Sequence, residues 1–396
     1  MKRRILTTII LSGLMLSLCV PDAYGARLTR KQKKEIELIN VAQISFDEQQ
    51  YETAIEYYTK AIELNPDNAD TYAKRGNAKF LSGNFKDAVM DYTKAIEIDP
   101  SKENLYYNRG IAKSNLNAFE EVVEDYTKEL EINPDNANAY LNRGTTKVFL
   151  KKYNEAIDDF SKVIELDEKS ELGYYNRGVA RRNSGDYQGA IEDYSKVIEI
   201  NPENIEAYNN RGVAKFYLKD YEGAVEDYSK VIELNKNFKR AYYNRGIAYL
   251  GLKKYEDSIM DFTKELEINP KNDSAYYERG LAEERLSHNI SAKDDYTKAI
   301  ELNPDNADYY AARGALISKT EGDLLEAEKD LTKAIKLDYE DSEKYLTRAI
   351  IFCKQKAYLP AIDDLNDAIR YNPNNTQAYD LRSFAIKSLN EQKNVK

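Results

Sequence analysis

The sequence has few of the residues that catalysis and metal binding require. Its 396 residues include no tryptophan, one histidine and two cysteines. The histidine, His288, stands beside Asn289 where a turn between helices is expected, so we interpret it as a surface residue. No cysteines and histidines have the spacing of a metal site, and there is no glycine-rich phosphate-binding loop. We therefore predict that the protein is not an enzyme and binds no cofactor or metal.

Basic residues are outnumbered by acidic ones. The chain has 58 lysines and arginines against 68 aspartates and glutamates, which gives a net charge of −10. An acidic surface repels the phosphate backbone, so we do not expect nucleic acid as a partner. Cys353 is the one cysteine outside the N-terminal leader, and it stands in an apolar stretch. We expect it to be a buried, unreactive thiol.

The first 25 residues have the layout of a secretory signal peptide. Residues 2–4 are basic, residues 5–20 form an apolar run that is short for a membrane span, and small residues precede a cleavage position after Gly25. We therefore predict that residues 1–25 are a signal peptide and that the mature protein is exported, to the periplasm or the extracellular space. Two alternatives stay open: a retained N-terminal anchor, and a lipid anchor on Cys19.

Proline is scarce and occurs mainly at one kind of position. Seven of the nine prolines follow an asparagine or an aspartate, as in Asn65-Pro66 and Asn201-Pro202. A residue before proline disfavours the helical conformation, so these dipeptides indicate the ends of helices.

The chain repeats itself every 34 residues, and a glycine marks each repeat. The glycines that keep this spacing are Gly76, Gly110, Gly144, Gly178, Gly212, Gly246, Gly280 and Gly314. Apolar residues recur at helical spacing on both sides of a turn, as in residues 69–102 with a turn at residues 82–84. A fixed period of this length indicates stacked helical hairpins rather than one globular core.

Each repeat glycine lies in the middle of the predicted first helix, where it costs about 1 kcal/mol relative to alanine. Close packing of the two helices would compensate for this cost. We expect such packing because the second helix carries a small residue, such as Ala88, at the matching position.

The recurring order of aromatic residue, glycine, alanine, aromatic residue, alanine and proline resembles the tetratricopeptide repeat (TPR) family. The resemblance covers residues 35–375 as ten repeats, after a lead-in at residues 26–34. It implies an all-α superhelical solenoid whose first helices line a concave groove, with a polar capping helix and tail at residues 376–396. The ninth repeat departs from the pattern by one extra residue near Gly322.

An arginine precedes each repeat glycine, and an aspartate recurs on the second helix. The arginines are Arg75, Arg109, Arg143, Arg177, Arg211, Arg245, Arg279, Arg313, Arg348 and Arg382, and the aspartates are Asp91, Asp125, Asp159, Asp193, Asp227, Asp261, Asp295, Asp330 and Asp364. The first repeat has neither, so we expect the two positions to touch as a structural ion pair. A ligand-binding basic stripe is the alternative. Arg382 would meet Asp364 if pairing reached the preceding repeat, and no aspartate if it stayed within one repeat.

Asparagine stands two residues before the glycine in five consecutive repeats, at Asn108, Asn142, Asn176, Asn210 and Asn244. We call these five residues the asparagine ladder. The ladder is regional, so the fold does not require it, and Tyr107, Tyr175 and Tyr243 stand beside three of its members. A primary amide offers one acceptor and two donors, which match a peptide group or a pair of sugar hydroxyls. Alternatively, the asparagines only cap or link neighbouring first helices.

The ladder resembles that of the O-linked N-acetylglucosamine transferase family, whose TPR superhelix holds extended peptide backbone. Only the ladder carries over, because the catalytic domain of that family has no counterpart in this sequence. We therefore predict a non-enzymatic scaffold for protein–protein interaction that binds extended peptides or partner proteins through the ladder and its three tyrosines. The alternatives are a glycan- or cell-wall-binding module in the same groove, and a subunit that presents substrate to a separate enzyme.

Overall fold

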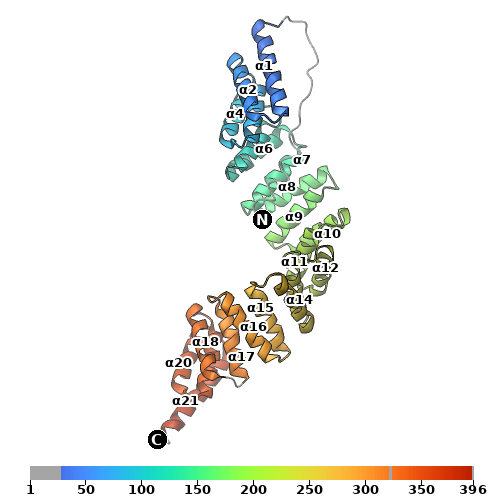
Figure 1. The fold of residues 1–396 in the computed structure, drawn as a ribbon. Coiled ribbons are helices and arrows are strands. Elements are labelled where there is room, and N and C mark those ends of the chain that lie inside the picture. Colours follow the sequence, from blue (N-terminus) through green and yellow to red (C-terminus); the bar gives the residue numbers. More distant parts are fainter. Residues whose placement is uncertain (1–27, 321–322, 395–396) are drawn as a thin grey trace. The chain divides into compact units, whose positions relative to one another are not determined.

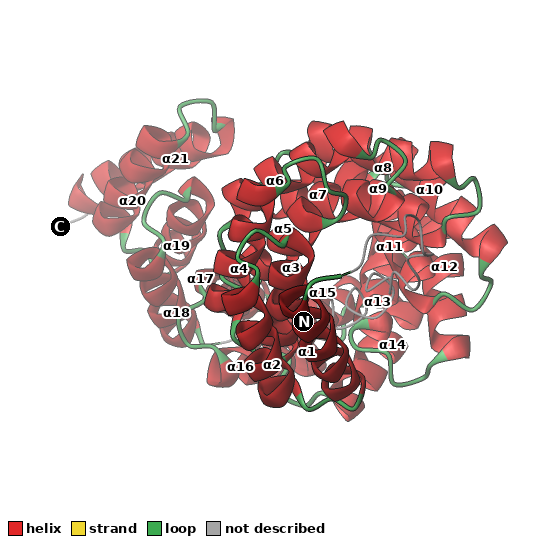
Figure 2. Cartoon of the chain, turned by 90° about the horizontal axis from the view of Figure 1, so that it is seen from above, coloured by secondary structure: helices red, strands yellow, loops and turns green. Residues whose placement is uncertain are grey.

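A computed structural model describes residues 28–320 and 323–394. Within these ranges every regular element is an α-helix, and Figure 2 shows helices joined by short loops. The predicted all-α solenoid of helical hairpins is confirmed. The predicted signal peptide, residues 1–25, lies outside the described residues. The chain divides into two compact units, residues 1–202 and 203–396.

The N-terminal unit consists of five helical hairpins, coloured blue to green in Figure 1. Its helices are α1 (Arg30–Asp47), α2 (Tyr51–Leu64), α3 (Ala69–Leu81), α4 (Phe85–Ile98), α5 (Leu105–Ser114), α6 (Phe119–Ile132), α7 (Ala137–Phe149), α8 (Tyr153–Leu166), α9 (Glu171–Ser184) and α10 (Tyr187–Ile200). Each odd-numbered first helix packs against the second helix that follows it, and each second helix packs against the next first helix of the unit.

The C-terminal unit contains five further hairpins and a last single helix, coloured yellow-green to red in Figure 1. Its helices are α11 (Ile205–Tyr217), α12 (Tyr221–Leu234), α13 (Ala241–Gly251), α14 (Tyr255–Ile268), α15 (Asp273–Arg285), α16 (Asn289–Leu302), α17 (Ala307–Lys319), α18 (Leu324–Leu337), α19 (Ser342–Lys354), α20 (Tyr358–Tyr371) and α21 (Thr376–Asn394). The order of packing is the same as in the N-terminal unit.

Local sequence signals set the ends of the hairpin helices. The turn between α9 and α10 contains Gly185 in the left-handed conformation, with φ 91°. Asp186 then caps α10, because its carboxylate accepts a hydrogen bond from the backbone N–H of Gly189. At the other end, Asn201 is extended and stops α10 before a proline, as the Asn-Pro signal predicts.

The repeat glycines make room for aromatic rings from the second helices. A Cβ added at Gly178 would lie 2.9 Å from the ring of Tyr194, and one at Gly144 would lie 2.8 Å from the ring of Phe160. Both rings are fully buried. The nearest atoms to an added Cβ at these positions therefore belong to a ring, and not to the small residue that the sequence suggested. Glycine is needed because a large ring, rather than an alanine, fills the space beside the first helix.

The last helix, α21, covers the tenth hairpin. Ala378 and Ala385 are fully buried on the side that packs against α20. The sequence predicted a polar capping helix. The outer side is in fact partly apolar, because Tyr379, Phe384 and Ile386 are at least 39% exposed.

Candidate functional site

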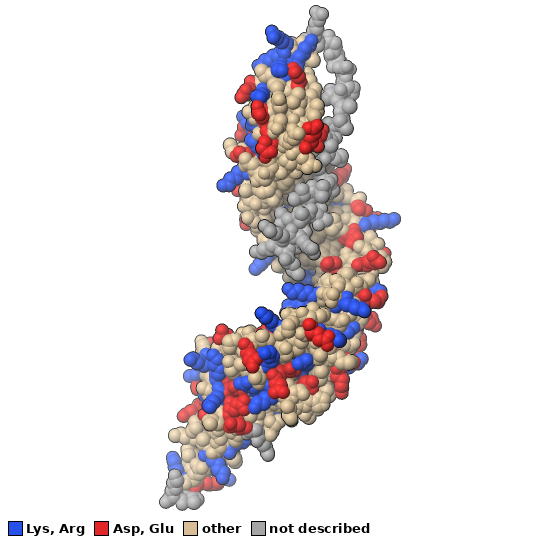
Figure 3. All heavy atoms as spheres, viewed as in Figure 1, with Lys and Arg blue, Asp and Glu red and all other residues tan. Residues whose placement is uncertain are grey.

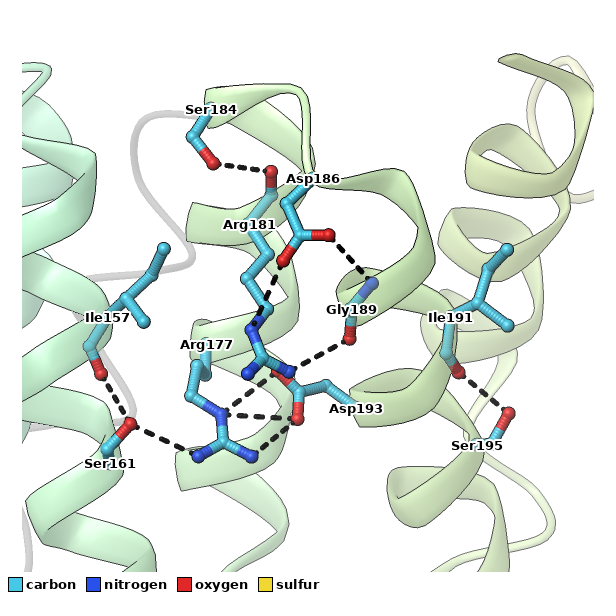
Figure 4. Close-up of polar contacts among 10 residues, drawn as sticks. All are labelled: Ile157, Ser161, Arg177, Arg181, Ser184, Asp186, Gly189, Ile191, Asp193 and Ser195. Carbon is cyan, nitrogen blue, oxygen red and sulfur yellow. Dashed lines mark hydrogen bonds and ion pairs between the residues drawn. The ribbon is translucent and has the colours of Figure 1, made fainter. Parts of the chain in front are cut away.

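Repeat arginines join neighbouring hairpins within each unit. Figure 4 shows Arg177 of α9 between Ser161 of α8 and Asp193 of α10. Its Nη2 lies 2.8 Å from Oδ1 of Asp193, and its Nη1 donates to Oγ of Ser161 at 3.1 Å. That hydroxyl in turn donates to the carbonyl oxygen of Ile157. The serine hydroxyl thus accepts a hydrogen bond from the arginine and donates one to the backbone of the preceding hairpin, so its donor and its acceptor are both satisfied.

The same ion pair recurs within nine repeats. The pairs are Arg75–Asp91, Arg109–Asp125, Arg143–Asp159, Arg177–Asp193, Arg211–Asp227, Arg245–Asp261, Arg279–Asp295, Arg313–Asp330 and Arg348–Asp364. The aspartate side chains are only 2–8% exposed. The predicted structural pairing is confirmed, and it lies within one repeat. Arg382 fits this rule, because it donates to Asn366 at 2.8 Å and meets no aspartate among the described residues.

A second cation reaches the aspartate in the earlier repeats only. Lys147 lies 2.9 Å from Asp159, and Arg181 lies 3.0 Å from Asp193 (Figure 4). Lys147 and Arg181 stand three residues after a repeat glycine. From Gly246 on, the residue at this position is not basic: it is Tyr249 in α13 and Glu283 in α15. Asp261 therefore depends on Arg245 as its sole described cation. Burial raises the pKa of Asp261, and the guanidinium of Arg245 opposes that rise.

In the N-terminal unit the three members of the asparagine ladder have different surroundings. Asn142 is buried, and its amide donates to the hydroxyl of Tyr107 at 3.1 Å. Asn176 is partly exposed, and its amide donates to the carbonyl oxygen of Leu172 in its own helix at 2.9 Å. Asn108 is partly exposed, and its side chain has no hydrogen-bond partner among the residues described. Asn142 thus links two first helices, whereas the amide of Asn108 is available to a ligand.

In the C-terminal unit, Asn210 and Asn244 are both partly exposed. The amide of Asn244 donates to Oδ1 of Asn209 in the preceding first helix, at 3.4 Å. This contact spans 35 residues, the same register as the contact of Asn142 with Tyr107. Linking of first helices, the alternative role for these asparagines, therefore occurs at two ladder positions. Ligand binding by the ladder stays a prediction.

The three tyrosines beside the ladder pack on the cores of their own hairpins. The ring centroids of Tyr107 and Tyr126 are 5.7 Å apart, those of Tyr175 and Tyr194 are 5.9 Å apart, and those of Tyr243 and Phe262 are 5.7 Å apart. Tyr107 is only 4% exposed, so its ring is a core residue in this conformation. Tyr175 and Tyr243 are partly exposed and can contact a ligand.

Family models of the tetratricopeptide repeat match most of these hairpins. A model described as TPR repeat matches residues 42–83, 76–117 and 180–218. Two models described as tetratricopeptide repeat match residues 205–238 and 240–272, and residues 137–170 and 273–306. Together they cover more than half of the chain. The chain belongs to the tetratricopeptide repeat family. TPR proteins generally serve as scaffolds for protein interaction.

Several solved structures resemble parts of this TPR protein. YrrB, whose structure is described as a TPR protein with an unusual peptide-binding site, is 26% identical over 47% of this chain and 96% of that chain, with a TM-score of 0.44. A TPR protein from Parabacteroides merdae is 22% identical over 63% and 99%, with a TM-score of 0.46. MamA from Desulfovibrio magneticus is 25% identical over 42% and 95%, with a TM-score of 0.41. Comparison with curated proteins gives no match.

The TPR hairpins also place a carboxylate where the ladder stops. Glu278 of α15 occupies the ladder position that follows Asn244, and its side chain is partly exposed. No hydrogen bond or ion pair reaches this carboxylate from the described residues. Burial raises its pKa. The sequence showed this change from asparagine to glutamate, but the lack of a partner could only be found in three dimensions.

A cavity of about 480 Å³ in the N-terminal unit lies between the C-terminal ends of α8 and α10. Its lining includes Tyr174, Arg177 and Lys196. These charges are already compensated, because Arg177 pairs with Asp193 and Lys196 pairs with Glu199. The two lining cations are therefore not free to bind an anionic ligand, and the first-helix positions are the better candidate site.

In the described ranges no group of three or more histidine, cysteine, aspartate or glutamate side chains could hold a metal ion. None of the described helices combines the length and the apolar character needed to cross a bilayer. Cys353 is partly exposed rather than buried as expected, and burial of its thiol nevertheless raises its pKa.

Proposed function

We propose that this TPR protein is a non-enzymatic scaffold that binds extended peptide segments of partner proteins along its first helices. The observation that carries this proposal is the partly exposed amide of Asn108, which has no partner among the described residues. Asn176 supports it, since its Oδ1 accepts no hydrogen bond from a described residue. Backbone-directed contacts of this kind tolerate many ligand sequences, and partly exposed rings such as Tyr175 would add apolar contact.

Peptide capture can be tested with defined probes. We expect residues 26–396, immobilised and exposed to a phage-displayed library of random dodecapeptides, to enrich peptide sequences. Replacing Asn108 and Asn176 together by alanine should weaken the best synthetic peptide roughly tenfold, because each amide contact contributes about 0.5–1.5 kcal/mol. Fluorescence anisotropy with the labelled peptide measures the loss.

Asn142→Ala is the matched control for this prediction. Its amide is buried and bonded to the Tyr107 hydroxyl, so the substitution should lower stability by about 1–2 kcal/mol and leave peptide affinity unchanged. If the double variant binds as tightly as the wild type, the ladder does not hold peptide. Enrichment of no peptide, with binding seen on a glycan array instead, would favour the carbohydrate-binding alternative.

Export is a second part of the proposal. It is supported by residues 1–25, with their basic start, apolar run and small residues before Gly25. We expect N-terminal sequencing of the protein from its native cells to begin at Ala26. An intact leader, or a chain that begins at a lipid-modified Cys19, would instead place the protein on a membrane surface.

A further inference from the structure

Glu278 is an unusual residue for its position. The equivalent position of the other first helices in the C-terminal unit carries Asn210, Asn244, Ala312 and Thr347, all of which are neutral. A partly buried carboxylate without a partner costs free energy, because water is removed from the charge and nothing replaces it. Departures of this kind from the local rules of a fold are concentrated at functional sites.

Two aromatic rings lie close to this carboxylate. Burial is the largest cause of the raised pKa of the Tyr243 phenol, and the charge of Glu278 is the second largest. Burial, Asp308, Glu278 and Glu284 together raise the pKa of Tyr277 to about 12, although the charge of Lys344 opposes the rise. The register of 35 residues seen at Asn142 and Asn244 likewise places Glu278 opposite Tyr243. Glu278 therefore faces Tyr243 of α13 and stands beside Tyr277 of its own helix.

The other acids near Tyr277 already have cations. Glu284 lies 3.2 Å from Nζ of Lys319, and Asp308 lies 3.4 Å from Nζ of Lys344. Ala312 of α17, which occupies the position equivalent to Glu278, carries no charge and is partly exposed. Asp273, which lies near Tyr243, accepts hydrogen bonds from Asn303 and Tyr309. Glu278 is thus the acid of this group that has no partner among the described residues.

We propose that Glu278, Tyr243 and Tyr277 form a pocket for the cationic side chain of a lysine or arginine in the bound peptide. The carboxylate would form a charge-assisted hydrogen bond with the ammonium or guanidinium. The guanidinium of Arg240 already lies over the ring of Tyr243, at 5.3 Å, so the tyrosines would add apolar contact to the stem of the bound side chain. The proposal rests on the proposed peptide-binding function and adds a preference for one class of side chain. The acidic net charge of the chain favours the approach of such a ligand.

The test compares four versions of residues 26–396 with the same random dodecapeptide library. They are the wild type, Glu278→Gln, Glu278→Lys and the control Glu256→Gln, which removes an exposed charge from α14. We expect the wild type and the control to select peptides with lysine or arginine at a fixed position. Glu278→Gln should lose this selection, and Glu278→Lys should select aspartate or glutamate in its place.

Synthetic peptides then isolate the side chain. One selected peptide, N-acetylated so that its terminal ammonium is absent, is compared with versions that carry norleucine for lysine or citrulline for arginine. The neutral version should bind the wild type at least fivefold more weakly and bind Glu278→Gln as well as the charged version does. Raising the salt concentration should weaken only the charged peptide on the wild type.

The outcomes separate this inference from the proposed function. Selection of peptides without enriched lysine or arginine would overturn the cation pocket and leave peptide binding intact. If N-acetylation abolishes binding, the terminal ammonium and not a side chain is the ligand, and the cation pocket is again overturned. If no version selects any peptide, both proposals fail. Circular dichroism of each variant confirms that the helices are unchanged.

Discussion

Arg245→Met should destabilise the C-terminal unit by about 3–5 kcal/mol, because removal of one partner leaves a buried charge uncompensated. Asp261 is 4% exposed, and Arg245 is its sole cation among the described residues, with Nε 2.7 Å from Oδ2. Arg245 also donates to the hydroxyl of Ser229 in the preceding hairpin, at 3.0 Å. The substitution therefore removes the ion pair and the contact between two hairpins together.

Arg143→Met is the matched comparison in the N-terminal unit. Asp159 is similarly buried, but Lys147 stays 2.9 Å away after the substitution. We expect a loss of about 1–2 kcal/mol, because the carboxylate keeps one cation. Hydrogen exchange of the helices around each pair is the appropriate measurement, since hairpins of a repeat protein can open locally. Equal losses in the two variants would show that the second cation contributes nothing.

The pH dependence of Arg245→Met gives a further check. Without the guanidinium, burial and the charge of Asp257 both act on Asp261 unopposed, so its pKa in the folded protein should rise further above the value in the unfolded chain. The folded state then binds more protons than the unfolded state, and stability falls as pH rises through the raised pKa. The deficit of Arg245→Met should therefore shrink when the pH is lowered from 7 to 5. Arg143→Met should show a smaller change.

The period of the sequence was sufficient to predict the hairpins and the ion pairs. Residues that recur at one position of many repeats report a contact that those repeats share, as the pairing of Arg177 with Asp193 shows. The hydroxyl that completes this contact is also visible in the sequence, because a threonine or serine such as Ser161 stands two residues after every paired aspartate except Asp364. The period alone does not reveal its role, because the partner arginine lies in the next repeat.

The surroundings of individual asparagines could not be predicted in the same way. Asn142 and Asn244 each meet the side chain that the preceding first helix presents, which is Tyr107 for Asn142 and Asn209 for Asn244. Leucine in that place offers no hydrogen bond, and Asn176, which follows Leu141 by 35 residues, turns back to its own helix. One repeated residue thus has several structural roles, which only coordinates distinguish.

A buried glutamate in α6 makes contacts that depend on the local backbone of one repeat rather than on the repeated pattern. Glu129 is fully buried where most second helices carry alanine or valine, such as Val163. Its carboxylate accepts from the backbone N–H groups of Asn104 at 3.1 Å and Tyr107 at 3.3 Å. The first turn of α5 has no side-chain cap of its own, because Asn104 is left-handed with φ 66°. Glu129 of α6 therefore caps the N-terminus of α5, the first helix of the same hairpin.

Glu129→Val should consequently destabilise the N-terminal unit by about 2–5 kcal/mol, although it restores the residue type of other repeats. Two backbone N–H groups would be left without an acceptor, a buried one at Tyr107 and a partly buried one at Asn104, and an unsatisfied buried donor costs about 1–3 kcal/mol. Burial raises the pKa of Glu129, and the N–H donors oppose the rise, so the carboxylate is held by these contacts. Urea unfolding and exchange of the Asn104 and Tyr107 amides measure the effect.

Glu265→Val in α14 is the control for this prediction. Glu265 occupies the same position and is 3% exposed, but the one hydrogen bond it accepts from the described residues comes from the amide of Asn272, at 2.9 Å. Its replacement leaves one side-chain donor unpaired rather than two backbone donors, so we expect a loss of about 1–2 kcal/mol. Should Glu129→Val be as stable as the wild type, α5 does not need the carboxylate, and a buried glutamate at this position would be a cost that the fold merely tolerates.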